Sequence, residues 1–248
     1  MKLLVHGGVS GIEKALPPIA HAIEAAKGAT TALDAVVTSV TTRNPIQLAR
    51  RVMEQTPHVL MSATGAMRLA ADLPELTSTS DEQEQRWVTA RDAGTLSPEY
   101  FGAPQHVDTV GAIALDDDGR LAVGSSTGGV FGKLPGRAGD ACVFGAGFYA
   151  SRSSAAMGTG VGELFIESFA CARVGLAIEE GAHPQEACER VIELIGERAT
   201  STAGLVALDR DGRVGAAFRG GALRVESTDG PIEARRLSGR APDNRADE

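Results

Sequence analysis

The order of apolar and polar residues along the chain predicts a mixed α/β (α+β) fold. An apolar run at 2–5 is typical of a buried strand, and the stretch 109–126 predicts a β-hairpin around an aspartate-rich turn. The same pattern returns at 204–218, and helical periodicity between the two hairpins predicts helices at 162–181 and 183–199. Two hairpins separated by two helices indicate a sheet that an antiparallel helix pair covers.

The remaining sequence predicts shorter elements. Before residue 73 these are helices at 12–27 and 31–40, a helix that Asn44 caps and Pro45 opens, a strand at 58–63 and a helix at 64–72. Residues from about 74 to 108 are polar and aperiodic, which predicts a mobile linker with one short helix around Trp87. The sequence after Val225 is again polar, so we expect a frayed tail.

Composition narrows the class of protein. Of the 248 residues, 43% are hydrophobic and 23% are charged, as in an ordinary soluble globular protein. The net charge of −8 and the lack of a lysine–arginine cluster argue against nucleic acid or an anionic membrane as a partner. No apolar run approaches the roughly 18 residues of a membrane helix, and the N-terminal stretch is too short for a signal-peptide core.

Candidate chemistry is sparse when residues are judged by local pattern alone. The three cysteines, Cys142, Cys171 and Cys188, have no metal-like spacing and indicate reduced thiols in a cytoplasmic protein. The five histidines stand apart from any partner at metal spacing, so no metal site is predicted. On this basis Thr109 and Thr127 are ordinary strand and turn residues.

A set of longer motifs carries more information than these single residues. They are VHGGVSG, LDAVVTSV, NPIQLARRVMEQTPHVLM, DTVGAIALDDDGRLAVGSSTGGVFGKLPGRAGD, GAGFYA and GTGVGE. The combination of DTVGA with STGG-x-x-x-K-x-x-GR-x-GD is the most specific of them. On these motifs the chain resembles the isoaspartyl peptidase/plant-type L-asparaginase family of N-terminal-nucleophile hydrolases.

The resemblance implies a single domain over 1–248 with a four-layer αββα sandwich. In the family the precursor cuts itself before a threonine, which here is the bond between Asp108 and Thr109. Residues 1–108 would then form an α-subunit-like part and residues 109–248 a β-subunit-like part. The family also implies a homodimer of these processed αβ units, with asparagine or a small β-aspartyl peptide as substrate.

The cut has a chemical logic that Thr109 itself carries. A threonine hydroxyl is a poor nucleophile unless a base stands beside it. Cleavage frees the α-amino group of Thr109, whose pKa of about 7.7–8.0 leaves it partly neutral near pH 7. One residue would therefore supply both nucleophile and base, without a histidine and without a cofactor.

The remaining roles carry over by position. Thr127 would orient the hydroxyl and amine of Thr109. Thr159 and Gly160 would supply hydrogen-bond donors to the tetrahedral oxyanion, and Gly160 would also contact the substrate. Arg137 would hold the substrate α-carboxylate, and Asp140 its α-ammonium group.

The chain also departs from the family pattern. Several tens of residues are missing between Val40 and Thr41, where the family has a glycine-rich loop around a sodium ion and a further hairpin. The loss puts that structural sodium in doubt, and one sheet should be truncated. Val107 and Val161 stand where the family commonly has histidine.

Three functions are compatible with these residues. The first is an autocatalytically cleaved threonine hydrolase that acts on β-aspartyl peptides or L-asparagine through an ester on Thr109. The second keeps this nucleophile but processes or transfers an amide or isoaspartyl linkage in a larger peptide partner. The third is an uncleaved, non-catalytic member that binds an amino acid or a protein.

Overall fold

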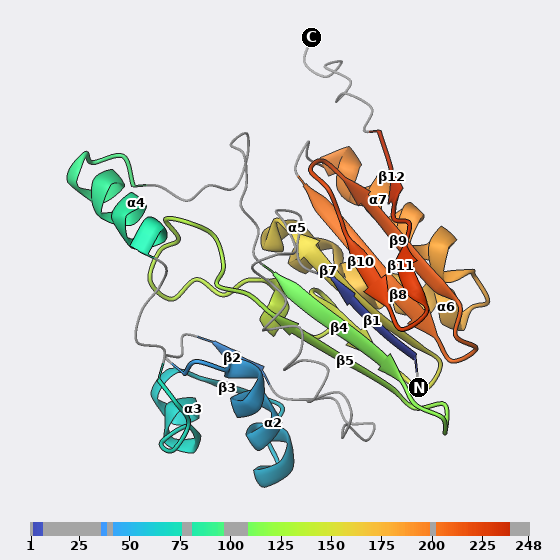
Figure 1. Cartoon of the computed structure of the whole chain (residues 1–248), viewed down its shortest axis with the longest axis horizontal. Coiled ribbons are helices and arrows are strands. Elements are labelled where there is room, and N and C mark those ends of the chain that lie inside the picture. Colours follow the sequence, from blue (N-terminus) through green and yellow to red (C-terminus); the bar gives the residue numbers. More distant parts are fainter. Residues whose placement is uncertain are drawn as a thin grey trace.

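The computed structural model describes residues 2–6, 36–38, 42–75, 81–96, 109–198 and 202–238. In this part of the chain the strands form two five-stranded sheets and one two-stranded sheet, accompanied by helices (Figure 1). The predicted mixture of helices and sheets is therefore confirmed. The helix predicted at 12–27 lies outside the described residues.

The first sheet has the strand order β11-β10-β1-β4-β5. Its strands are β1 (Lys2–His6), β4 (Val110–Leu115), β5 (Leu121–Ser126), β10 (Val225–Ser227) and β11 (Gly230–Ile232). β1 lies in the middle, antiparallel to both β4 and β10. The predicted first strand and first hairpin are confirmed. The prediction of a frayed tail after Val225 is wrong up to Arg236, because strands of this polar segment pair with β1 and β9.

The second sheet has the order β12-β9-β8-β7-β6. Its strands are β6 (Phe148–Ala150), β7 (Ser154–Gly160), β8 (Ala203–Asp209), β9 (Val214–Arg219) and β12 (Arg235–Arg236). The hairpin predicted at 204–218 is confirmed. The sequence did not predict β7, because serine, alanine and glycine have weak strand preferences. Burial of every residue of β7 compensates for that weakness.

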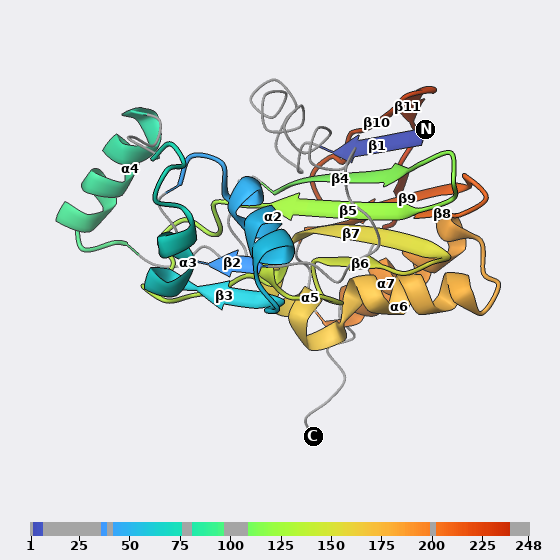
Figure 2. The same cartoon turned by 90° about the horizontal axis from the view of Figure 1, so that it is seen from below.

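The two sheets are stacked face to face (Figure 2). Leu4 and Ile113 of the first sheet and Met157, Val206 and Leu208 of the second are buried in the core between them. Side chains alternate along a strand, so the neighbouring residues of β8 point to the opposite face of the second sheet. That face packs against helices.

The helices on the second sheet are α5 (Gly162–Ser168), α6 (Ala170–Glu179) and α7 (Pro184–Arg198). Phe165 of α5, Val174 of α6 and Ile192 of α7 are buried in one cluster with Leu205 of β8. A single helix at 162–181 is a wrong prediction, because Phe169 adopts the left-handed conformation (φ 48°, ψ 48°) and separates α5 from α6. Helical periodicity cannot reveal a break at one residue that keeps apolar spacing on both sides.

Smaller elements complete the described chain. They are β2 (Val36–Thr38), α2 (Pro45–Gln55), β3 (Leu60–Ser62), α3 (Ala63–Leu69), α4 (Asp81–Asp92) and the 3₁₀ turn η1 (Asp140–Cys142). The helix after Asn44, the strand and helix that follow, and the helix around Trp87 are confirmed. The helix predicted over 31–40 is wrong at 36–38, where β-branched residues pair with β3 in parallel. No helix in the described ranges is long and apolar enough to cross a membrane.

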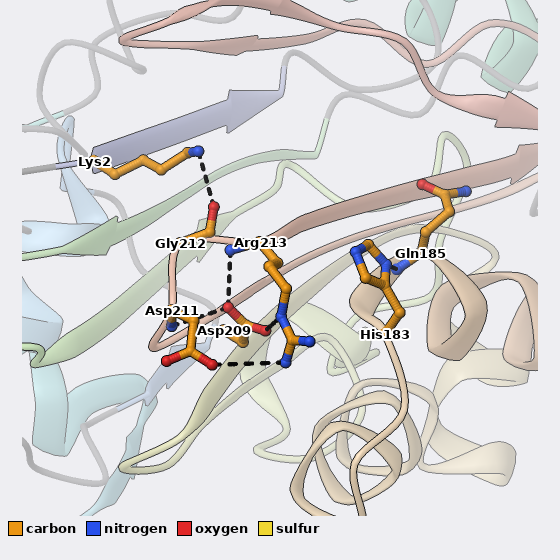
Figure 3. A network of polar contacts seen from close by, with 7 residues as sticks. All are labelled: Lys2, His183, Gln185, Asp209, Asp211, Gly212 and Arg213. Atoms are coloured by element: carbon orange, nitrogen blue, oxygen red, sulfur yellow. Dashed lines mark hydrogen bonds and ion pairs between the residues drawn. The ribbon is translucent and has the colours of Figure 1, made fainter.

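The two hairpins β4–β5 and β8–β9 share one turn chemistry. In each, an aspartate at the strand end accepts hydrogen bonds from two backbone N–H groups and from an arginine Nε. For Asp209 the donors are Asp211 N at 3.0 Å, Arg213 N at 2.8 Å and Arg213 Nε at 2.6 Å (Figure 3). Lys2 Nζ adds a bond to Gly212 O at 2.9 Å and so ties β1 to this turn.

The turns differ in burial, which gives a matched pair of variants. The side chain of Asp209 is 2% exposed, whereas that of Asp116 in the β4–β5 turn is 35% exposed. Asp209→Ala should lower the free energy of unfolding by about 2 kcal/mol, because it removes a buried carboxylate that accepts three hydrogen bonds. Asp116→Ala should cost clearly less, since water replaces its carboxylate. Chemical denaturation of both variants tests the order, and equal losses would contradict it.

Figure 3 also shows His183 in a hydrogen bond at the start of α7. Its Nδ1 accepts a hydrogen bond from Gln185 N at 3.1 Å, just where α7 begins. The Gln185 side chain then bonds both the N–H and the C=O of Ala216 in β9, at 2.9 and 3.0 Å. His183 therefore completes a helix start, and Gln185 fastens that helix to the sheet.

Candidate active site

Thr109 and Thr127 meet at one end of the β4–β5 hairpin. Thr109 directly precedes β4 and Thr127 directly follows β5, and the strands pair Val110 with Ser126. Antiparallel pairing therefore brings together two residues that are 18 positions apart in sequence. Thr109 Oγ1 donates to Thr127 Oγ1 at 3.2 Å, and Thr127 Oγ1 also accepts from Gly129 N at 3.0 Å. Thr109 is 3% exposed.

Thr159 and Gly160 form the end of β7, which packs against β4 and β5. Gly160 has a φ of 151°, and a Cβ at this position would lie 2.5 Å from Thr202 O, so only glycine fits. Thr159 Oγ1 is buried and has no hydrogen-bond partner among the described residues. A buried hydroxyl of this kind is a donor that a ligand oxygen would satisfy.

Arg137 and Asp140 lie in the loop between β5 and β6, and Asp140 opens η1. The turn η1 contacts both β5 and α5, so it links the β4–β5 hairpin with that helix. A Cβ added to Gly162 would lie 2.7 Å from Asp140 Oδ1 and 3.0 Å from Arg137 Nη2. The two charged groups therefore pack closely against the start of α5, and the absence of a side chain at Gly162 lets them come this near.

Asp140 is a buried carboxylate whose surroundings would favour a bound cation. It is 4% exposed, and its Oδ2 has no hydrogen-bond partner among the described residues. Burial raises the pKa of Asp140 to about 6, against the opposing effects of nearby backbone N–H groups and of Arg137, while Glu163 raises it further. An ammonium group beside Asp140 would stabilise the ionised carboxylate and supply the missing partner.

The cysteines offer no such site. Cys142, Cys171 and Cys188 are all free thiols, and burial raises the pKa of each. A thiol with a raised pKa is a poor nucleophile at neutral pH. Among the described residues there is also no group of three or more His, Cys, Asp and Glu side chains placed to bind a metal ion.

Four of the candidate residues thus form two groups. Thr159 and Gly160 lie apart from these groups, at the end of β7. Thr109 contacts Thr127 directly, and Arg137 and Asp140 flank Gly162. Asp108 and Val107 lie outside the described residues. Sequence reasoning missed Glu163, which pairs with Arg137 through two hydrogen bonds. The motif GTGVGE contained this glutamate, but only the folded chain shows its arginine partner.

The β4–β5 hairpin thus brings Thr109 to Thr127, and the loop before β6 brings Arg137 and Asp140 to Gly162 at the start of α5. Comparison with known protein families gives the class: the chain belongs to the asparaginase family, which it matches over residues 20–228.

Individual relatives bear similar names. The chain is 43% identical to the isoaspartyl peptidase of Escherichia coli over 188 residues, covering 71% of this chain and 58% of the relative. It is 38% identical to the plant-type L-asparaginase of Pyrobaculum calidifontis over 178 residues, covering 69% and 60%. It is 34% identical to the isoaspartyl peptidase/L-asparaginase of Danio rerio over 184 residues, covering 71% and 58%. The matched part is thus about three fifths of each relative's length.

Proposed function

We propose that this protein is a threonine amidohydrolase that cuts itself between Asp108 and Thr109 and hydrolyses L-asparagine or β-aspartyl peptides. The observation that carries the proposal is the partly buried hydrogen bond between Thr109 Oγ1 and Thr127 Oγ1, 3.2 Å long, at the residue where the new N-terminus would arise. The names of the relatives give the substrate class, because isoaspartyl peptides and asparagine share one reacting group, a side-chain amide.

In the proposed reaction Thr109 Oγ1 attacks the carbonyl carbon of that side-chain amide. The freed α-amino group of Thr109 takes the hydroxyl proton and passes it to the leaving amine. The C–N bond breaks and an aspartyl ester forms on Thr109, which water then hydrolyses. The contact with Thr127 Oγ1 would hold Thr109 Oγ1 in position before the α-amino group takes its proton.

The other groups would bind charge. Thr159 Oγ1, which lacks a partner among the described residues, and the Gly160 N–H would stabilise the oxyanion of the tetrahedral intermediate. Arg137 would bind the α-carboxylate and Asp140 the α-ammonium group, since both charged groups lie close together beside Gly162. A zwitterionic end would thus present one charge to each of the two residues.

This proposal needs no cofactor, since Thr109 supplies nucleophile and base. The sodium-binding loop of the family does not fit this chain, because only residues 39–44 separate β2 from α2. We therefore derive no step through that ion.

We further propose that the chain forms one domain with a fourth, helical layer and a truncated first sheet. Leu3, Ala112 and Ala114 support the extra layer, because they are buried on the face of the first sheet opposite the inter-sheet core. The free thiols support a cytoplasmic protein. A homodimer of processed units, with 74–108 as the linker that is cut, completes the proposal.

Intact-mass measurement combined with an activity assay tests the proposed function. The purified protein should yield two fragments split between residues 108 and 109, and it should release ammonia from L-asparagine or leucine from β-Asp-Leu. Turnover of long isoaspartyl peptides alone would instead support a processing enzyme for a larger partner. A chain that stays intact and inactive would overturn the proposal in favour of a binding protein.

A further inference from the structure

Glu163 holds Arg137, the proposed ligand of the substrate α-carboxylate, through two hydrogen bonds. It lies in α5 directly after Gly162, and its carboxylate accepts hydrogen bonds from Arg137 Nε at 3.0 Å and from Arg137 Nη2 at 2.8 Å. We propose that Glu163 is a positioning residue that makes the site selective for substrates with an α-carboxylate. The proposal rests on the proposed function and assigns a determinant of its specificity.

The two hydrogen bonds fix the plane of the guanidinium. They use its Nε–Nη2 edge, so that a ligand carboxylate would approach the Nη1–Nη2 end. Two glycines make room for this orientation. A Cβ at Gly139 would lie 2.7 Å from Nη1, and one at Gly162 would lie 3.0 Å from Nη2. The glycines of the GR-x-GD and GTGVGE motifs therefore let the guanidinium lie where Glu163 holds it.

Burial makes this restraint necessary. The Arg137 side chain is 11% exposed and that of Glu163 is 36% exposed. A desolvated guanidinium needs an anion, and without Glu163 it would turn towards the carboxylate of Asp140, which lies beside it at Gly162. Such a turn would remove Arg137 from the α-carboxylate and block Asp140 from the α-ammonium group. Glu163 prevents it by occupying one edge of Arg137 permanently.

A second arginine–glutamate pair provides the control. Arg235 Nη1 donates to Glu189 Oε1 at 3.0 Å and to Oε2 at 2.9 Å, on the outer helix α7 and strand β12. Glu189→Gln removes the same charge from a similar pair outside the candidate site. Any effect that both variants share is an effect on folding or on net charge.

The experiment compares L-asparagine with β-alaninamide, which lacks the α-carboxylate and keeps the amine and the amide. In processed protein, Glu163→Gln should raise KM for L-asparagine about tenfold and leave kcat within about twofold, as loss of uniform binding does. The kcat/KM for β-alaninamide should change less than about twofold, so the preference for L-asparagine should fall. Glu163→Asp should restore part of the preference, and Glu189→Gln should match the wild type.

The outcomes separate this proposal from the proposed function. Equal losses for both substrates in Glu163→Gln, or no change with L-asparagine, would overturn the role of Glu163 while the enzyme assignment stands. If the wild type hydrolyses neither substrate, the proposed function is refuted. The role of Glu163 is then tested by calorimetric measurement of the binding of L-aspartate and β-alanine. Glu163→Gln should then weaken binding of L-aspartate alone. A wild type that binds neither ligand would overturn the Glu163 proposal as well.

Discussion

Thr109→Ala is expected to leave the chain uncut and without hydrolytic activity. Alanine removes the hydroxyl that donates to Thr127 Oγ1 at 3.2 Å, and with it the proposed nucleophile for both self-cleavage and turnover. Loss of a nucleophile lowers kcat by several orders of magnitude, on the order of 10⁶ in a well-studied hydrolase. A denaturing gel should show one full-length band, and ammonia release from L-asparagine should fall to the background rate.

The matched control is Thr109→Ser, which keeps both a hydroxyl and an α-amino group at residue 109. It should still be cut, and it should keep measurable turnover, because serine can perform the same chemistry without the methyl group that restricts its rotamer. Release of ammonia by Thr109→Ala at the wild-type rate would refute Thr109 as nucleophile. An uncut Thr109→Ser would point to a packing role for the threonine methyl.

Asp140→Asn is expected to abolish substrate affinity. It should also be more stable relative to wild type at neutral pH than at acid pH. Burial raises the pKa of Asp140 from 3.8 to about 6, so the folded protein binds this proton more tightly than the unfolded chain. The stability from this group is complete below the unfolded pKa of 3.8 and is lost as pH rises through about 6. Above that pH the loss amounts to about 3 kcal/mol of unfolding free energy. The Asp140→Asn variant does not suffer this loss, because its side chain does not ionise.

Chemical denaturation at pH 4 and pH 8 measures this effect. Between the two values, the unfolding free energy of Asp140→Asn relative to wild type should rise by about 3 kcal/mol. Asp209→Asn is the control, because Asp209 is also buried but its carboxylate accepts three hydrogen bonds. That variant should be less stable than wild type at pH 8. A pH-independent difference for Asp140→Asn would refute an unpartnered carboxylate at this position.

The sequence predicted the regular parts of the fold well, because these follow from local periodicity. The hairpins β4–β5 and β8–β9 and the helix α7 have clear apolar patterns. The strand β7 was missed because its residues are small, and their burial depends on the sheets and helices on either side. The sequence predicts a helix over β2, because a segment of three residues is too short to distinguish the helical period from the strand period, and only the pairing with β3 makes it a strand.

The candidate site shows the same division. The motifs, with the resemblance they carry, predicted Thr109, Thr127, Arg137 and Asp140 as candidates, and the structure pairs them two by two. Glu163 could not be assigned from its motif, because its partner Arg137 is 26 residues away and the pairing depends on the approach of η1 to α5. The raised pKa of Asp140 is likewise a property of its surroundings, which no motif records.

The central place of β1 in the first sheet has a consequence for folding kinetics. β1 hydrogen-bonds to β4 and β10, which belong to the other side of the proposed cut. A cut at residue 108 would therefore not release the N-terminal piece, but it would change the order of the refolding reaction. The uncut chain folds in a first-order reaction, whereas the two pieces must find each other in a second-order one, with a melting temperature that depends on concentration. If the chain folds before it is cut, the first folding reaction is first-order and fast, whereas refolding of the cut molecule after denaturation is second-order and slower.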